Sequence, residues 1–343
     1  MSETSEAVEN RLLLQSSPHL RDQDSVHKVM HTVVLALLPA AVAAVVFFGV
    51  RALAVMAVSV VACLAFEAAA LKIGGKPIKL HITDGSAIIT GLLLAMNLPS
   101  GIPIWMVVVG ALVAMVLGKH AYGGVGNNPF NPALVARVFL LISFPTAMTA
   151  WPTPAFGPEG LDAITTATPL GLLQMLGKGG EEAVLASSAL EKLDHWMLVL
   201  GNVKGCIGEV SAAALLLGGV FLLVRKVITW EIPVSFIGTV AAFTLVAWLI
   251  DGNMGNPVYH VLSGGVMLGA WFMATDMVSS PVSRKGMLVF GIGCGLLTCI
   301  IRMWAGYPEG VSFAILIMNG LVPLIDRYAK PAGFGDSSVQ EGA

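Results

Sequence analysis

The stretch Gly91-Leu92-Leu93-Leu94-Ala95-Met96-Asn97-Leu98-Pro99 decides the fold, because a related stretch recurs as Gly269-Ala270-Trp271-Phe272-Met273-Ala274-Thr275-Asp276-Met277. A second pair of similar segments runs from Lys119 to Leu141 and from Arg302 to Leu324. In both pairs the two segments are about 180 residues apart. We interpret them as an internal duplication, and the alternative is a chance resemblance between apolar sequences.

Both copies of the first stretch are short and end in polar or Pro-rich sequence, at Asn97-Leu98-Pro99 and at residues 276–281. Broken or half-length helices persist at membrane depth only where protein or water satisfies their free backbone groups. These two segments are therefore the predicted lining of any central route through the molecule.

The composition is that of a membrane protein. Hydrophobic residues make up 56% of the 343 residues and charged residues 12%, about half of the ~25% typical of soluble domains. The mean hydropathy is +0.82. About ten apolar stretches are long enough to cross a ~30 Å hydrocarbon core, at residues 27–48, 52–72, 84–98, 103–118, 132–149, 206–225, 232–250, 258–276, 286–302 and 311–328.

The basic residues sort the loops between these spans into two sets. One set of alternate loops holds thirteen of the nineteen Lys and Arg residues, the other set holds five, and Arg137 lies inside a span. The positive-inside rule then places both termini in the cytoplasm and residues 150–205 outside. The first 25 residues hold no apolar core of a cleavable signal peptide, and a net charge of −2 gives no support to a nucleic-acid partner.

We therefore predict an all-α polytopic membrane protein of the bacterial inner membrane, in contact with membrane lipid. Its about ten transmembrane helices form two five-helix repeats, and because five is odd the second repeat is inverted relative to the first. The predicted parts are a cytoplasmic segment (1–26), the first repeat (27–149), a periplasmic segment (150–205), the second repeat (206–328) and a cytoplasmic tail (329–343).

The four cysteines do not form a metal or redox motif. Cys63, Cys206, Cys294 and Cys299 lie in apolar runs, and none belongs to a Cys-x-x-Cys pair, so the sequence shows no zinc or iron–sulfur site. We expect buried small side chains. A cluster that takes single cysteines from neighbouring subunits stays an alternative.

The periplasmic segment contains the polar stretch Asp162-Ala163-Ile164-Thr165-Thr166-Ala167-Thr168-Pro169-Leu170. Its spacing, Asp-x-x-Thr-x-Ala-Thr, resembles the signal by which a flavin transferase esterifies the phosphate of FMN to the final threonine. Pro169 is expected to open a helix, whose first backbone N–H groups would lie close to an attached phosphate. The alternative is a threonine helix cap without a cofactor.

With these residues the chain resembles the D subunit of the Rnf (Rsx) electron-transport complexes and, more distantly, the B subunit of sodium-pumping NADH:quinone oxidoreductase. The motifs that carry the resemblance extend over most of the chain. They are Ser17-Pro18-His19, the segment from Asp84 to Gly91, Asn97-Leu98-Pro99, Asn128-Pro129-Phe130-Asn131-Pro132-Ala133 and the segment from Asp162 to Leu170.

The resemblance implies covalent FMN on Thr168, within an exposed motif that the transferase reads through Asp162, Thr165, Thr166 and Ala167. The family usually has glycine where this chain has Thr166, and threonine restricts the backbone more. The resemblance also implies partner subunits of the A, B, C, E and G type and a flavin transferase during maturation. A second, non-covalent flavin such as riboflavin is implied near the Asn-Pro turn around Asn131, where the asparagines are alternatively helix caps.

Charged residues within spans are costly in hydrocarbon and are therefore candidates for function. Glu67 and Arg302 are expected near the membrane interface, and Glu209 lies at the start of a span. The candidate ion or electron route consists of Arg137 and Asp276, together with Asn97 and Asn131. The alternative for the charged pair is a structural ion pair.

The leading hypothesis is a membrane subunit of a translocase-type, ferredoxin/NAD-linked oxidoreductase complex, which passes electrons while Na⁺ or H⁺ is moved and is not catalytic alone. The chain has no dinucleotide-binding glycine motif, so that chemistry belongs to other subunits. The runner-up is a small-solute channel or secondary transporter built from inverted repeats. A third hypothesis is a scaffold with a vestigial flavin motif. The sequence leaves the ion and the direction of electron flow open.

Overall fold

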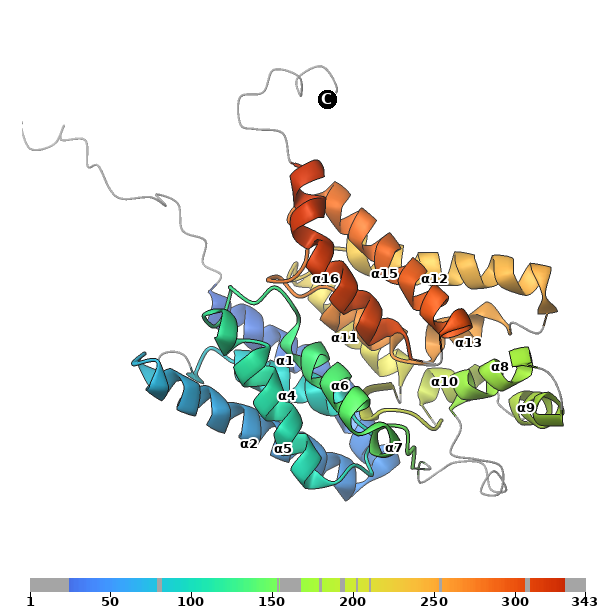
Figure 1. The fold of residues 1–343 in the computed structure, drawn as a ribbon, viewed down its shortest axis with the longest axis horizontal. Helices are drawn as coiled ribbons and strands as arrows, with labels where there is room; N and C mark the ends of the chain where they lie inside the picture. Colours follow the sequence, from blue (N-terminus) through green and yellow to red (C-terminus); the bar gives the residue numbers. More distant parts are fainter. Residues whose placement is uncertain are drawn as a thin grey trace, which may run out of the picture.

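The computed structural model describes residues 25–78, 82–152, 154, 168–178, 181–191, 195–201, 203–209, 211–252, 255–305 and 309–330. Within these ranges every regular element is a helix (Figure 1). The predicted all-helical class is therefore confirmed for the described part of the chain.

The described amino-terminal half contains five main helices. They are α1 (Val26–Phe48), α2 (Val50–Ile73), α4 (Ser86–Met96), α5 (Ile104–Leu112), which continues as the π-helical turn η2 (Val113–Leu117), and α6 (Pro132–Ser143). Phe144 leaves the helical conformation before α7 (Pro145–Met148). Proline disfavours a helical residue before it, so the predicted span 132–149 is divided in two.

The carboxy-terminal half begins with the single turn η4 (Ile207–Glu209) and α11 (Ala212–Val224). It continues with α12 (Glu231–Ile250), α13 (Pro257–Leu262), α14 (Val266–Leu268), the π-helical turn η6 (Gly269–Met273), α15 (Arg284–Trp304) and α16 (Val311–Tyr328). Between the halves lie α8 (Pro169–Lys178), α9 (Glu181–Glu191) and α10 (His195–Leu200).

Six of the described helices are long and apolar enough to cross a membrane: α1, α2, α5 with its continuation to Tyr122, α12, α15 and α16. Three shorter apolar helices, α4, α6 and α11, accompany them. Large aliphatic side chains such as Val50 and Ile250, 79% and 82% exposed, cover the outer faces of the long helices. Apolar exposure on this scale is typical of a surface that faces lipid, and the chain is a multi-pass membrane protein.

Small residues bring the helices close together. A Cβ atom on Gly91 of α4 would lie 2.7 Å from the Cα atom of Val60 on α2, and the Ser59 hydroxyl donates to the Gly91 carbonyl at 2.7 Å. Gly218 of α11 packs against the Ala36 backbone of α1 in the same way. Helices in lipid associate through such close approaches. The α1–α11 contact joins the two halves, and α6 and α16 form a second contact between them (Figure 1).

Two helical segments are interrupted within the molecule. The eleven residues of α4 rise only about 16 Å, and the chain leaves the helix at Asn97, as the sequence predicts. The predicted span 258–276 is broken between α13 and α14, where Gly264 and Gly265 have φ angles of +70° and +72°. Glycine adopts this left-handed conformation without the steric cost that other residues meet. The two breaks leave backbone groups that must find partners inside the protein.

The helices α8, α9 and α10 form a small group with an apolar core of its own. Leu170, Leu173, Leu190 and Leu198 are buried in it. The group lies beside α13, away from the start of α1 and the end of α16 (Figure 1). This packing fixes the position of Thr168, which directly precedes α8.

Candidate functional site

Thr168 is the N-cap of α8. Its Oγ1 accepts a hydrogen bond from the backbone N–H of Gly171 at 3.2 Å, and its carbonyl accepts from Leu172. Pro169 occupies the first helical position, as the sequence predicts. Thr168 is only 6% exposed, so the expectation of an exposed threonine was wrong. The other motif residues lie outside the described residues: Asp162, Thr165, Thr166 and Ala167.

The start of α8 is held against the break between α13 and α14. A Cβ atom on Gly264 would overlap both the Leu170 side chain and the guanidinium of Arg302. Arg302 donates to the carbonyls of His260, Ser263 and Gly264 at 2.5, 3.0 and 2.8 Å. The side chain of Gln174 on α8 in turn donates to the Arg302 carbonyl at 3.1 Å.

Arg302, expected near the membrane interface, is 4% exposed and is therefore enclosed by protein. Its guanidinium replaces the hydrogen bonds that the broken helix cannot make, since carbonyls at a helix end lack partners within the helix. Thr168 and the interrupted segment are thereby parts of one structural unit.

A second group of polar side chains surrounds Arg137 at the break after α4; we call it the central cluster. Arg137 donates to the Asn97 amide oxygen at 2.6 Å and forms an ion pair with Glu309. The Cys206 thiol donates to the Asn97 carbonyl at 3.3 Å and lies 3.9 Å from both carboxylate oxygens of Glu309. Arg137, Asn97 and Cys206 are 4%, 2% and 0% exposed, so these three members are fully internal.

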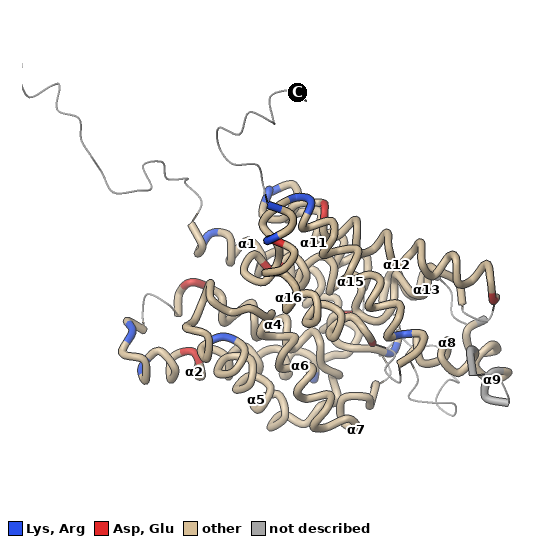
Figure 2. Tube along the Cα trace, turned by 45° about the horizontal axis from the view of Figure 1, so that its top comes forward, with Lys and Arg blue, Asp and Glu red and all other residues tan. Residues whose placement is uncertain are grey.

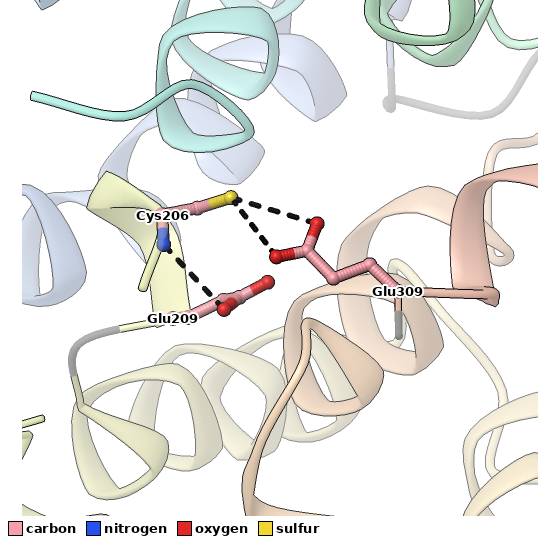
Figure 3. Close-up of side chains that lie close together, drawn as sticks. All are labelled: Cys206, Glu209 and Glu309. Carbon is pink, nitrogen blue, oxygen red and sulfur yellow. Dashed lines mark hydrogen bonds between the residues drawn. The ribbon is translucent and has the colours of Figure 1, made fainter. Parts of the chain in front are cut away.

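Glu209 completes the central cluster (Figure 3). Its Oε2 accepts from the backbone N–H of Cys206 at 3.4 Å. The Cys206 sulfur and one oxygen each of Glu209 and Glu309 lie within 4.8 Å of one another. Thiolate and carboxylate are ligands that a metal ion accepts. The ion pair between Glu309 and Arg137 already neutralises one carboxylate, which leaves less negative charge to attract a divalent ion.

The candidate route residues Asn97, Asn131 and Arg137 lie close together in the structure. The amide nitrogens of Asn97 and Asn131 reach the sulfur and the carbonyl of Met273 at 3.6 and 3.3 Å. Asn131 also caps α6 by accepting from the N–H group of Ala133. Both proposed roles of the Asn-Pro turn, capping and lining a site, are therefore structurally available.

A cavity of about 100 Å³ that opens to the surface lies beside Asn131, between α1, α4, α11 and the end of η6. Its walls are mainly apolar and include Leu93 and Phe272. A mostly apolar pocket with a few placed polar groups is the usual form of a small-molecule site. The polar residues that line it are Ser86, Thr90, Lys119, Asn128, Asn131, Thr275 and Asp276.

Asp276 is the fourth candidate route residue; it lines the same cavity as Asn131 and does not pair with Arg137. Its carboxylate accepts from the Ser279 hydroxyl at 3.0 Å, which is a local turn contact. It reaches the wall of the cavity beside Asn131, whereas Arg137 pairs with Glu309 and Asn97 in the central cluster. Arg137 therefore forms an ion pair, as the alternative interpretation expected, but its partner is Glu309 and not Asp276.

The ammonium of Lys119, which lines this cavity, forms a buried ion pair with Glu67. It lies 2.5 Å from Glu67 and donates to the Ser86 hydroxyl at 2.8 Å. Glu67 is 1% and Lys119 3% exposed. Glu67, expected near the membrane interface, is thus enclosed by protein and ion-paired with Lys119. Glu67 and Lys119 are 52 positions apart in the chain. No spacing rule in the sequence predicts their contact, and only the folded structure shows it.

All four cysteines are buried, which confirms the expectation of inward-facing side chains. A cluster shared with another subunit needs thiols at the surface, and none of the four reaches it. Glu309 was not singled out from sequence, because it lies in a short connection before α16 and not in an apolar run. The one signal in the sequence was Arg137, an arginine within a predicted span that has no carboxylate nearby in the chain and therefore needs a distant partner.

The fold and these sites define the chain as an all-helical, multi-pass membrane protein with broken helices around a buried polar centre. Comparison with known proteins then identifies it more narrowly. Residues 13–335 match the family described as NQR2, RnfD, RnfE. The chain belongs to this family.

Three relatives match over nearly their whole length. The chain is 46% identical to the D subunit of the proton-translocating ferredoxin:NAD(+) oxidoreductase complex of Clostridium ljungdahlii, covering 95% of this chain and 97% of the relative. It is 46% identical to the D subunit of the Na(+)-translocating ferredoxin:NAD(+) oxidoreductase complex of Acetobacterium woodii, covering 98% and 99%. It is 43% identical to the D subunit of the ion-translocating oxidoreductase complex of Stutzerimonas stutzeri, covering 91% and 93%.

Proposed function

We propose that this chain is the D-type membrane subunit of an ion-translocating, ferredoxin:NAD⁺-linked oxidoreductase complex and that it carries FMN on Thr168. The names of relatives that are similar over the whole chain support membership of such a multi-subunit complex. The position of Thr168 at the start of α8, against the interrupted segment of the second half, carries the proposal for the cofactor site.

The residues at α8 fit a phosphoester. The Thr168 oxygen that FMN would esterify already faces the backbone N–H of Gly171. A helix N-terminus favours phosphate because its first N–H groups and its dipole both attract an anion. When bound, FMN supplies one- and two-electron redox chemistry. The residues Arg302 and Gln174 anchor this segment to the membrane helices. Because Thr168 is buried in the docked state, the transferase must act before α8 packs down.

The cavity beside Asn131 is the proposed site of the second, non-covalent flavin. Its apolar walls suit an isoalloxazine ring, and Asn128 and Lys119 offer hydrogen-bond donors to ring oxygens and nitrogens. The hydroxyls of Thr90 and Thr275 line it as well. The wild type is expected to retain riboflavin after mild detergent extraction. Asn128→Leu should lose riboflavin while its covalent flavin is unchanged, and these two results would support the assignment. Retention in Asn128→Leu equal to that of the wild type would contradict it.

Orientation and repeat architecture are part of the same proposal. Figure 2 shows Lys and Arg at the amino-terminal end of α1 and at the carboxy-terminal end of α16. This supports cytoplasmic termini, with α8 on the periplasmic side of the inner membrane. The broken segments after α4 and after α13 support two inverted repeats that meet at the central cluster. The A, B, C, E and G type subunits are the proposed partners.

Flavin fluorescence in a denaturing gel tests the proposal. The chain, expressed with its flavin transferase, is expected to fluoresce after SDS treatment, because a phosphoester survives denaturation. Thr168→Ala should abolish the signal, whereas Thr149→Ala, which removes a threonine hydroxyl from the end of α7, should retain it. A dark wild-type band, with the transferase active on another substrate, would refute the redox proposal. Measurements of solute flux would then test the transporter alternative.

A further inference from the structure

Three buried polar atoms near the start of α8 have no hydrogen-bond partner among the described residues. They are Ser263 Oγ, Arg302 Nε and Glu209 Oε1. Ser263 is 6% and Arg302 4% exposed. An unsatisfied buried polar group is costly, so such groups persist where water or a transient ligand completes them. Two donors and one acceptor are therefore available at this place.

The three atoms lie along the packed contact between the start of α8, Gly264, Gly265 and the central cluster. Gly264 contacts Leu170 of α8 on one side and the Arg302 guanidinium on the other. The next residue, Gly265, faces the cluster: a Cβ atom there would lie 3.1 Å from Glu209 Oε1 and 4.0 Å from Arg137 Nη1. Two adjacent glycines thus bring the start of α8 and the central cluster into close packing through one short stretch of backbone.

Glu209 differs from Glu309 in its partners. Glu309 is ion-paired with Arg137, whereas Glu209 has, within the described part of the chain, the N–H of Cys206 on one oxygen and no hydrogen bond on the other. The groups that face Glu209 are Cys206, Glu309 and Arg137 of the cluster, and Arg302, which interacts with it electrostatically. A proton on the free oxygen adds one bond and needs no further ligand.

We propose that Glu209 is a proton-loading carboxylate for the flavin site: it binds a proton when the flavin on Thr168 accepts an electron. This inference rests on the proposed function. The electron comes from the upstream carrier of the complex, which is oxidised by one electron. One proton from the periplasmic side converts the Glu209 carboxylate to the carboxylic acid and balances the added charge. Because Glu209 is partly exposed while its Oε1 is buried, the proton has an entrance, and the added negative charge provides the driving force.

Redox-triggered infrared difference spectroscopy of the flavin-loaded complex tests this step directly. The wild type is expected to gain the carbonyl stretch of a protonated carboxylic acid on one-electron reduction, and Glu209→Gln should lose that band. Glu231→Gln is the matched control, because Glu231 is 2% exposed and also has an unpaired oxygen, but it pairs with Arg284 where α12 and α15 begin, away from the cluster. This variant should keep the band.

The flavin midpoint potential gives an independent readout. Uptake of one proton per electron shifts the potential by about 59 mV per pH unit, and the slope should flatten in Glu209→Gln and return in Glu209→Asp. A wild type that holds flavin but shows neither the band nor a slope sensitive to Glu209 overturns the inference alone. A potential that follows Na⁺ at constant pH also overturns it. A wild type without flavin overturns the proposed function as well, and the denaturing gel distinguishes that case.

Discussion

The ion pair between Arg137 and Glu309 gives the sharpest prediction about stability. Arg137→Met removes the guanidinium but keeps most of the side-chain volume. It leaves Glu309, whose side chain is 10% exposed, without its cation. Breaking a buried pair from one side costs about 3–5 kcal/mol, whereas replacing both partners with apolar residues is often close to neutral. The single variants Arg137→Met and Glu309→Met should therefore each be less stable than the double variant.

A double-mutant cycle measures this difference. Unfolding free energies in mixed detergent micelles, followed by tryptophan fluorescence, are expected to show a coupling energy of about 6 kcal/mol, because two single losses of about 3 kcal/mol each are absent from the near-neutral double variant. Additive effects of the two substitutions would refute the reasoning, because they would mean that Arg137 and Glu309 do not compensate each other inside the protein.

Three further substitutions test separate parts of the structure. Gly91→Leu should prevent α4 from packing on α2 and reduce the yield of folded protein in size-exclusion chromatography, whereas Gly238→Leu, at a glycine facing open space, should not. Gly264→Ala, strained by its φ of +70° and by the contact with α8, should raise the protease sensitivity of α8 while α1–α6 stay protected. Asn131→Ala should cost about 1 kcal/mol through the lost helix cap, measured as a lower unfolding free energy, and should weaken retention of the second flavin.

The apolar pattern predicted the helices well, because lipid-facing helices must satisfy their own backbone groups and be apolar. It also predicted that the segment ending at Asn97 is short. It did not predict that the span 258–276 is interrupted at Gly264 and Gly265, since glycine is frequent in membrane helices. Only the folded structure reveals the break, through the hydrogen bonds of Arg302 to the freed carbonyls.

The sequence predicted only part of the central cluster. Sequence position marked Arg137 and Asn97 as unusual, because polar groups in a span are costly. It gave no indication of their partners Glu309 and Cys206, which come from distant connections and meet only in the folded protein. The burial of Thr168 was missed because burial depends on which helix packs over a residue, and the pattern of a single helix does not contain that information.

Peptide mapping by mass spectrometry of the chain isolated from its own membranes tests the central claim most directly. We predict that the peptide containing Thr168 carries one FMN through a phosphoester, with fragment ions that place the added mass on Thr168 and not on Thr165 or Thr166. A peptide recovered only in its unmodified form, from a membrane in which other flavin-transferase substrates are modified, would contradict this claim.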